Sequence, residues 1–333
     1  MSVPLGRSMA RVLDRPAAGN RIERLLDTGP QDWKQYCFAM LGFNVLAFLV
    51  GFAVLALQPV LPLNPDGKGM LAPTTLFNTA ASFLTNTNLQ HYSGEVHLSY
   101  FSQLFFICWK QFVTPAIGLA ALLAVIRGLR GDAHLGNFYL DLWRGVMGVL
   151  LPLSFVVAVL LVVGGVPMTL AGAEKVTTLE GGEQTIARGP VAAIIAIKQL
   201  GTNGGGYFGV NSSHPLENPS AWTNVLENVC ILLIPMACVV MFGRMLKSHG
   251  QAWVIFAVMM VCRFVPIIAP IALAASLAAK KQTPFTAGTL RTDTVTFGCV
   301  LLGTVILVGA LLFLPVATLG PVAEHLGPLP FGQ

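Results

Sequence analysis

Long apolar runs with little or no charge constrain the fold of this chain more than any other feature. The first run, residues 37–57, is 21 residues long, and Asn44 is its main polar interruption. About 20 apolar residues cross a bilayer, and a spanning segment in lipid must satisfy its own backbone groups as a helix. Charged residues make up only 11% of the chain, against about 25% in soluble domains. The sequence therefore predicts an all-α polytopic membrane protein with about six spans. The predicted spans are residues 37–57, 100–126, 146–170, 225–242, 252–279 and 295–318.

Two further apolar segments are too short to cross a membrane, and they resemble each other. Pro73–Leu84 runs into a polar Thr-Asn loop at residues 85–88, and residues 190–200 run into a second Thr-Asn loop at 201–206. In both, a proline precedes the threonine by 12 residues, and the two Thr-Asn pairs lie 117 residues apart. Proline suits the first turn of a helix. The chain therefore predicts two membrane–pore–membrane units, each with a short re-entrant pore helix between two spans.

The loop charges and the spans divide the chain into five parts. Basic residues gather in 1–34, 127–144 and 243–250, which places these segments on the cytoplasmic side and both Thr-Asn loops at the outer face. No apolar core of signal-peptide length occurs in residues 1–32, so we expect no cleaved secretory signal. The predicted parts are a cytoplasmic N-terminal segment (1–36), a first membrane–pore–membrane unit (37–126), a cytoplasmic loop (127–145), a second unit (146–242) and C-terminal membrane segments (243–333).

The two polar loops are candidate cation-binding segments. Their short helices aim C-terminal ends, which carry partial negative charge, toward the membrane interior. Glycine-rich backbone lets carbonyl oxygens approach an ion closely, as in carbonyl-lined filters. The alternative interpretation is a pair of structured extracellular loops that bind no ion. The candidate ligands are oxygens of Thr85, Asn86, Thr87, Asn88, Thr202, Asn203, Gly204, Gly205 and Gly206.

Other polar residues in apolar surroundings have competing interpretations. His214 has no second metal-binding residue nearby, so we interpret it as a hydrogen-bonded structural histidine. Lys110 and Glu227 lie near predicted span ends, which favours side chains that snorkel to the interface. Lys198 precedes the second loop and either tunes that loop or pairs away from it. Arg263 lies deep in an apolar run and is either a functional charge, a structural partner or an interfacial residue.

Several kinds of site are absent from the sequence. The six cysteines fall in apolar runs and form no C-x-x-C pair, so we expect neither a disulfide framework nor a zinc site. There is no G-x-x-x-x-G-K-[ST] loop, no Asp-Lys-Thr-Gly phosphorylation site and no soluble segment long enough for a nucleotide-binding domain. We therefore expect no nucleotide on this chain and no chemistry of its own. The formal charge of +5 is explained by cytoplasmic loops and needs no nucleic-acid partner.

Several specific strings cover most of the chain: DWKQY (32–36), NTA (78–80), SFLTNTN (82–88), YSGE (92–95), GTNGGG (201–206) and NSSHPLENP (211–219), together with residues 98–103, 263–281 and 303–326. These strings resemble the potassium-binding A subunit of the Kdp-type potassium-transporting ATPase. This resemblance implies four membrane–pore–membrane units, like those of potassium channels, around one filter. It further implies that Asn86, Thr87, Asn88 and Gln90 belong to a first filter segment, and Thr202, Asn203, Gly204 and Asn211 to a second.

The resemblance also implies a function and a set of partners. Such a subunit lies in the bacterial inner membrane, among membrane lipid, and selects potassium at the outer face. It passes the ion through an intramembrane tunnel to a P-type ATPase subunit, and small accessory subunits complete the complex. Here only two of the four filter segments are found. Relative to the family, sequence is missing near residues 251–263. This loss explains why Lys280 and Lys281 would lie on the outer side of the membrane, contrary to the rule that basic loops are cytoplasmic. By this resemblance we also expect that a first span preceding Met1 is absent. The alternatives are a passive potassium channel built from two copies, or a truncated, non-transporting remnant.

Overall fold

The computed structural model describes residues 1–15, 19–90 and 92–260. The chain divides into two units, Met1–Arg263 and Phe264–Gln333, and the described elements belong to the first. The predicted span at 295–318 and most of the one at 252–279 lie outside the described residues. Arg263, Cys262, Cys299 and the end of the predicted junction at 251–263 also lie outside them. His249–Met260 is a short apolar helix.

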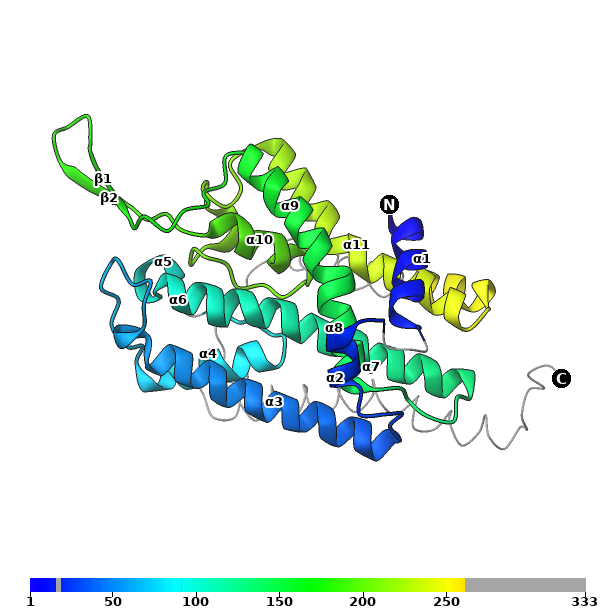
Figure 1. Ribbon diagram of the computed structural model, residues 1–333. Coiled ribbons are helices and arrows are strands. Elements are labelled where there is room, and N and C mark those ends of the chain that lie inside the picture. Colours follow the sequence, from blue (N-terminus) through cyan, green and yellow to red (C-terminus); the bar gives the residue numbers. More distant parts are fainter. Residues whose placement is uncertain (16–18, 91, 261–333) are drawn as a thin grey trace, which may run out of the picture. The chain divides into compact units, whose positions relative to one another are not determined.

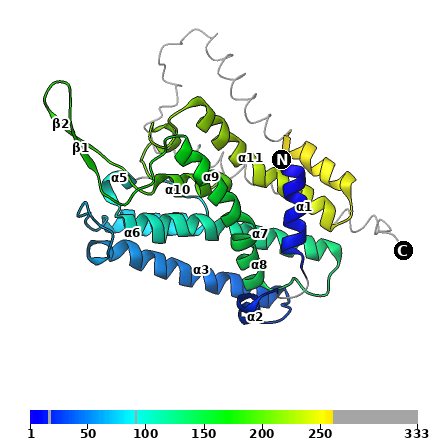
Figure 2. The ribbon, with the colours of Figure 1, turned by 45° about the horizontal axis from the view of Figure 1, so that its top comes forward.

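Four helices in the described part are long and apolar enough to cross a membrane. They confirm a polytopic, mostly helical membrane protein, and their outward side chains, such as Leu46 and Leu49 at 60% and 57% exposure, suit a lipid-facing surface. The first spanning helix is α3 (Trp33–Ala56), and the fourth is α11 (Ala221–Met245). The second is a continuous run of α6 (Tyr100–Ser102), the π-helical η2 (Gln103–Cys108) and α7 (Trp109–Arg130), and it lies beside α3 in Figures 1 and 2. The third is a continuous run of α8 (Phe138–Gly145), the π-helical η3 (Val146–Leu150) and α9 (Leu151–Val163).

The third spanning helix occupies Phe138–Val163 and not the predicted 146–170. It begins early because the Asn137 side chain accepts hydrogen bonds from the backbone N–H groups of Tyr139 and Leu140, an N-cap that the apolar pattern alone does not reveal. It ends early because Gly165 takes a φ of +96°, a left-handed conformation that stops the helix. The predicted loop at 127–145 therefore contains only a short connection between Arg130 and Phe138.

The two short helices appear where they were predicted. α4 spans Pro73–Leu84 with proline in its first turn, and α10 spans Val191–Leu200 directly after Pro190. α4 packs on α3 and α7, while α10 packs against α9 and α11; the label α10 lies beside α9 in Figure 1. Every side chain of α10 except Ala193 is buried. Each short helix thus sits against the spanning helices of its own half of the chain.

The N-terminal segment contains a helix that the sequence analysis did not predict. α1 (Ser2–Leu13) places Gly6, Met9, Ala10 and Leu13 on one buried face, a spacing typical of an amphipathic helix. This face packs along α11, and a Cβ on Gly6 would lie 2.5 Å from the Ala237 carbonyl oxygen. α2 (Arg21–Leu26) follows.

Short elements occupy the connections. β1 (Glu174–Thr177) pairs antiparallel with β2 (Glu183–Ile186), with Glu174 opposite Ile186 and Thr177 opposite Glu183. This hairpin is exposed and extends from the helices in Figures 1 and 2. The remaining connections carry η1 (Gln58–Val60), α5 (Gly94–His97) and η4 (Asn211–Ser213).

Candidate functional site

Both short helices lead into loops with left-handed backbone. Asn86 and Asn88 follow α4 with φ values of +60° and +46°, and Gly204 and Gly205 follow α10 with +75° and +70°. Glycine and asparagine tolerate this region, but Thr202 also adopts it at +52°. A β-branched residue there is strained, and such strain gathers at functional sites.

The two loops meet at matched positions of the repeat. The Asn203 Nδ2 group donates a hydrogen bond to Asn86 Oδ1 at 2.5 Å, and these residues are the asparagines of the two Thr-Asn pairs. Thr114 on α7 joins them, because its hydroxyl donates to Asn86 Oδ1 at 2.7 Å and accepts from Asn203 at 3.3 Å. Contact between equivalent residues is what two repeat units around a common axis produce.

Amide side chains hold the glycine-rich loop from two sides. Gln111 Nε2 donates to the carbonyl oxygens of Gly204 at 3.2 Å and Gly205 at 2.6 Å, and Asn88 donates to Gly204 at 3.3 Å. Gln90 donates to the Phe208 carbonyl at 3.2 Å. The inward carbonyls of the loop therefore lie among amide groups of α7 and of the first loop.

Gln90 also links the first loop to the far end of the second. Its Oε1 accepts from the Gly206 backbone N–H at 2.8 Å and from Asn211 Nδ2 at 2.9 Å. Eight of the eleven predicted ligands thus join one cross-loop network. Thr85, Thr87 and Thr202 make no hydrogen bond across the two loops in the described part of the chain. They are exposed at its edge, as is Gly204.

Three buried oxygens in this network accept no hydrogen bond from any described residue. They are Oδ1 of Asn88, Oδ1 of Asn203 and Oε1 of Gln111, on residues that are 3%, 4% and 0% exposed. A buried polar atom without a partner is costly, so native proteins rarely keep one without a reason. Amide oxygens are ligands that a hard monovalent cation accepts. The donor set therefore fits a cation.

A cavity of about 610 Å³ lies at the C-terminal ends of α4 and α10. Side chains of α3, α7 and α11 complete its wall, and no charged side chain of the described residues lines it. The partial negative charge of two helix ends is therefore the main fixed charge that the described residues direct at this space. Its polar lining consists of Asn44, Thr85, Asn86, Thr114 and Thr202.

A buried ion pair stabilises the second loop through contacts with its backbone and side chains. Lys198 Nζ lies 2.7 Å from Glu217 Oε2, and the two side chains are 3% and 0% exposed. Glu217 Oε1 also accepts the Phe208 backbone N–H at 2.8 Å, and Lys198 donates to Ser212 Oγ at 2.7 Å. A Cβ on Gly206 would lie 2.5 Å from Glu217 Oε1, so glycine is needed for this close approach. Lys198 thus pairs within the loop and not away from it.

The prediction that Lys110 and Glu227 snorkel is wrong. Lys110 is fully buried and Glu227 is 2% exposed. Lys110 lies ten residues inside a 31-residue helix. Its side chain packs close to Gly51 on α3, where the glycine has no side chain of its own, and its Nζ is 5.0 Å from the Trp109 ring centroid. Glu227 accepts a hydrogen bond from Gln199 at the end of α10. Helix packing, which sequence position does not reveal, directs both side chains inward.

The prediction that His214 is a hydrogen-bonded structural histidine is confirmed. His214 is structural, because its ring stacks on Phe208 with centroids 3.6 Å apart and its Nδ1 accepts the Leu216 backbone N–H at 3.1 Å. The four cysteines within the described ranges (Cys37, Cys108, Cys230 and Cys238) are free. No group of three or more histidine, cysteine or acidic residues with metal-site geometry occurs among the described residues.

Sequence reasoning missed several residues of this site. Gln111 and Thr114 come from α7, 93 and 89 residues away from the loop atoms they contact, and a polar residue inside a span was their only signal. Glu217 lies in residues 211–219, which the sequence analysis singled out without giving this glutamate a role. Its partner Lys198 lies 19 residues earlier, so no local pattern connects the two.

Comparisons with known proteins give the chain a family. A family model described as Potassium-transporting ATPase A subunit matches residues 1–262 and 257–326. The potassium-transporting ATPase potassium-binding subunit of Pseudomonas aeruginosa is 53% identical over 232 residues, which cover 69% of this chain and 41% of that relative. The subunit of the same name from Bacteroides fragilis is 46% identical over 273 residues, 78% of this chain and 48% of the relative. The chain therefore matches less than half the length of these relatives, and it belongs to the family of the potassium-transporting ATPase A subunit.

Proposed function

We propose that this chain is a potassium-binding and translocating membrane subunit of an ATP-driven, P-type potassium uptake system of the Kdp kind. The observation that carries the proposal is the meeting of two helix–loop repeats at Asn86 and Asn203, above a cavity that faces two helix C-terminal ends. Buried oxygens of Asn88, Asn203 and Gln111 that lack a donor among the described residues support the same conclusion. The names of the relatives, as potassium-binding subunits, supply the identity of the ion.

In this proposal the chain selects potassium and does no chemistry. Carbonyl and amide oxygens of Thr85–Asn88, Gln90, Thr202–Gly206 and Asn211 replace the hydration shell of the ion at the outer face of a bacterial inner membrane. The chain binds no nucleotide. A P-type ATPase subunit, joined by small accessory subunits in the surrounding lipid, receives the ion and supplies the energy.

A matched pair of substitutions tests the loop assignment. Asn203→Asp places a full negative charge in the network and should change potassium affinity, or selectivity against sodium, at least tenfold. Asn224→Asp makes the same chemical change on the exposed first turn of α11 and should leave both unchanged. The readout is potassium uptake and its sodium competition in a potassium-uptake-deficient cell that co-expresses the ATPase partner. Equal behaviour of the two variants would reject the filter assignment.

A second candidate, a passive channel built from two copies, is favoured by one observation. Thr85, Thr87, Thr202 and Gly204 form an exposed edge of the network, and a second copy could cover this edge and restore four filter segments around an axis. Uptake that continues without the ATPase subunit, together with homodimers in place of a co-purified ATPase, would select the channel. Subunit binding without uptake in either case would identify a non-transporting remnant.

A further inference from the structure

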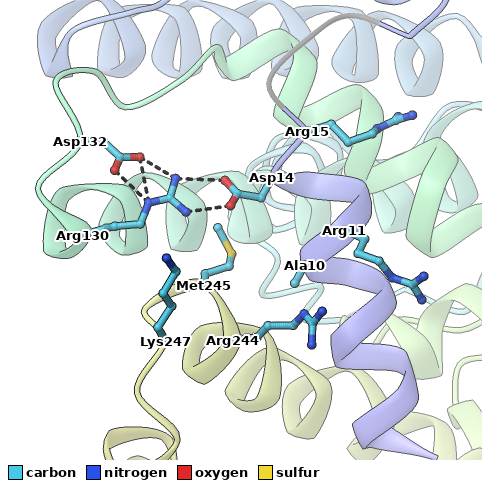
Figure 3. A pocket seen from close by; sticks show the side chains of 9 residues that line it. All are labelled: Ala10, Arg11, Asp14, Arg15, Arg130, Asp132, Arg244, Met245 and Lys247. Atoms are coloured by element: carbon cyan, nitrogen blue, oxygen red, sulfur yellow. Dashed lines mark hydrogen bonds and ion pairs between the residues drawn. The ribbon is translucent and has the colours of Figure 1, made fainter.

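A charged pocket of about 680 Å³ lies away from the ion-binding loops (Figure 3). Three chain segments form it: the C-terminal end of α1, the end of α7 with the following turn, and the end of α11. Arg130 is the last residue of one spanning helix and Arg244 lies in the last turn of another. The pocket therefore lies where spanning helices end, which is the level of lipid headgroups.

Positive charge exceeds negative charge in this pocket. Its lining holds five cations and two carboxylates, a difference of three. Arg130 is neutralised by Asp14 at 2.7 Å and Asp132 at 2.6 Å, as Figure 3 shows, and Arg15 pairs with Glu23 at 2.9 Å. The other three cations, Arg11, Arg244 and Lys247, have no carboxylate within ion-pair distance in the part of the chain that the structure describes. They are free to bind an anion.

An apolar groove of about 380 Å³ continues from the pocket. It runs between α1, α11 and the helix His249–Met260, and Arg244 lines both the groove and the pocket. Trp253 lines the groove while remaining 70% exposed, as a tryptophan at a membrane interface does. Its apolar walls consist of Val3, Met236, Val239, Val240, Trp253 and Phe256.

We propose that this pocket and groove bind one anionic phospholipid, such as a phosphatidylglycerol. The positive charges of Arg11, Arg244 and Lys247 attract its phosphodiester headgroup to the pocket, and one acyl chain follows the groove along α11. Basic pockets between spanning helices on the cytoplasmic side bind anionic headgroups in this way. A soluble anion would use the cations of the pocket but not the adjoining apolar groove. An apolar segment of a partner protein would use the groove but not the cations. A phospholipid uses both. The proposal is independent of the proposed potassium transport.

The test compares two double variants of the full-length chain in detergent micelles. Arg244→Gln with Lys247→Gln removes two exposed cations that make no ion pair among the described residues. Arg21→Gln with Arg24→Gln makes the same charge change on exposed positions of α2, outside both pockets. The probe is fluorescent dioleoylphosphatidylglycerol. Since each basic residue near an anionic bilayer surface contributes about a fivefold factor, the pocket variant should bind about twenty-five-fold more weakly and the α2 variant within about twofold of the unchanged chain.

Competition experiments decide what the pocket recognises. Unlabelled dioleoylphosphatidylglycerol should displace the probe, while dioleoylphosphatidylcholine and inorganic phosphate should not. Equal weakening in both double variants, or displacement by the choline lipid, would overturn the proposal, and displacement by inorganic phosphate would indicate a simple anion site. If the double variant does not fold, the single Lys247→Gln variant should show about a fivefold loss. An unchanged affinity there would also contradict the proposal.

Discussion

The Lys198–Glu217 pair should stabilise the fold far more than a surface pair of the same length. Glu217→Gln removes the charge of a side chain that is fully buried, and it leaves the ammonium of Lys198, 3% exposed, without its counter-ion. Breaking a buried pair in this way costs about 3–5 kcal/mol, because the remaining ammonium is out of water and keeps its hydrogen bond to Ser212 but not its counter-ion. At roughly 2 °C per kcal/mol for a chain of this size, the thermal midpoint should fall by about 6–10 °C.

The exposed hairpin offers a matched control. Glu174 lies 2.5 Å from Arg188, and the two side chains are 50% and 36% exposed. Glu174→Gln makes the same chemical change, yet a solvent-screened pair contributes only about 0–1 kcal/mol, so its midpoint should move by less than about 2 °C. Thermal unfolding of the detergent-solubilised chain measures both. Midpoints for the two variants within about 2 °C of each other would refute the claim that the buried pair holds the second loop.

Two further predictions concern stability. Gly206→Ala should lower the free energy of unfolding by about 1–3 kcal/mol, because the new Cβ would lie 2.5 Å from Glu217 Oε1, whereas Gly118→Ala, with nothing within 4 Å, should be neutral or stabilising. Burial raises the pKa of the Glu23 carboxyl, but the Gly19 N–H and the charges of Arg144 and Arg15 outweigh burial and hold the pKa below its ordinary 4.5. Since the unfolded state then binds the proton more tightly, stability present above pH 4.5 should be lost as pH falls through the lower folded pKa, and Glu23→Gln should flatten this acid dependence of the thermal midpoint.

The sequence predicted local features where single residues determine them. Pro73 sets the first turn of α4 and the polar run at Thr85 ends it, so the predicted and observed bounds of this helix agree. Apolar length also predicts that the four described long spans exist, but it does not give the ends of the third one. α1 was not predicted although its buried residues have amphipathic spacing, because the five arginines of residues 1–32 make this segment polar overall. Its partner α11 also lies more than 200 residues away in the sequence.

Side-chain direction was the feature that sequence could not supply. Lys110 and Glu227 were expected at the interface because their position along a span indicates depth but not facing. Facing depends on packing partners, and for Lys110 the partner is Gly51 on another helix. The same limit hid Gln111, whose side chain reaches the Gly205 carbonyl from a residue 94 positions away. The sequence identifies polar residues inside the spans, but it does not show which residues their side chains contact.

The exposed edge of the loop network bears on how much of the proposed filter one copy could form. In the ring of four segments that the family resemblance implies, every ligand faces the common axis, so a copy with two segments should expose the residues that would face the other half. Thr85, Thr87, Thr202 and Gly204 are exposed, while Asn88 and Asn203 remain buried where the two present segments meet. In the proposed filter the buried asparagines therefore supply ligands from one side, and the exposed edge is open to further ligands. A complete coordination shell for the ion requires water, the C-terminal part of this chain or a second polypeptide along that threonine-rich edge. The uptake and co-purification experiments distinguish a second copy of the chain from an ATPase partner.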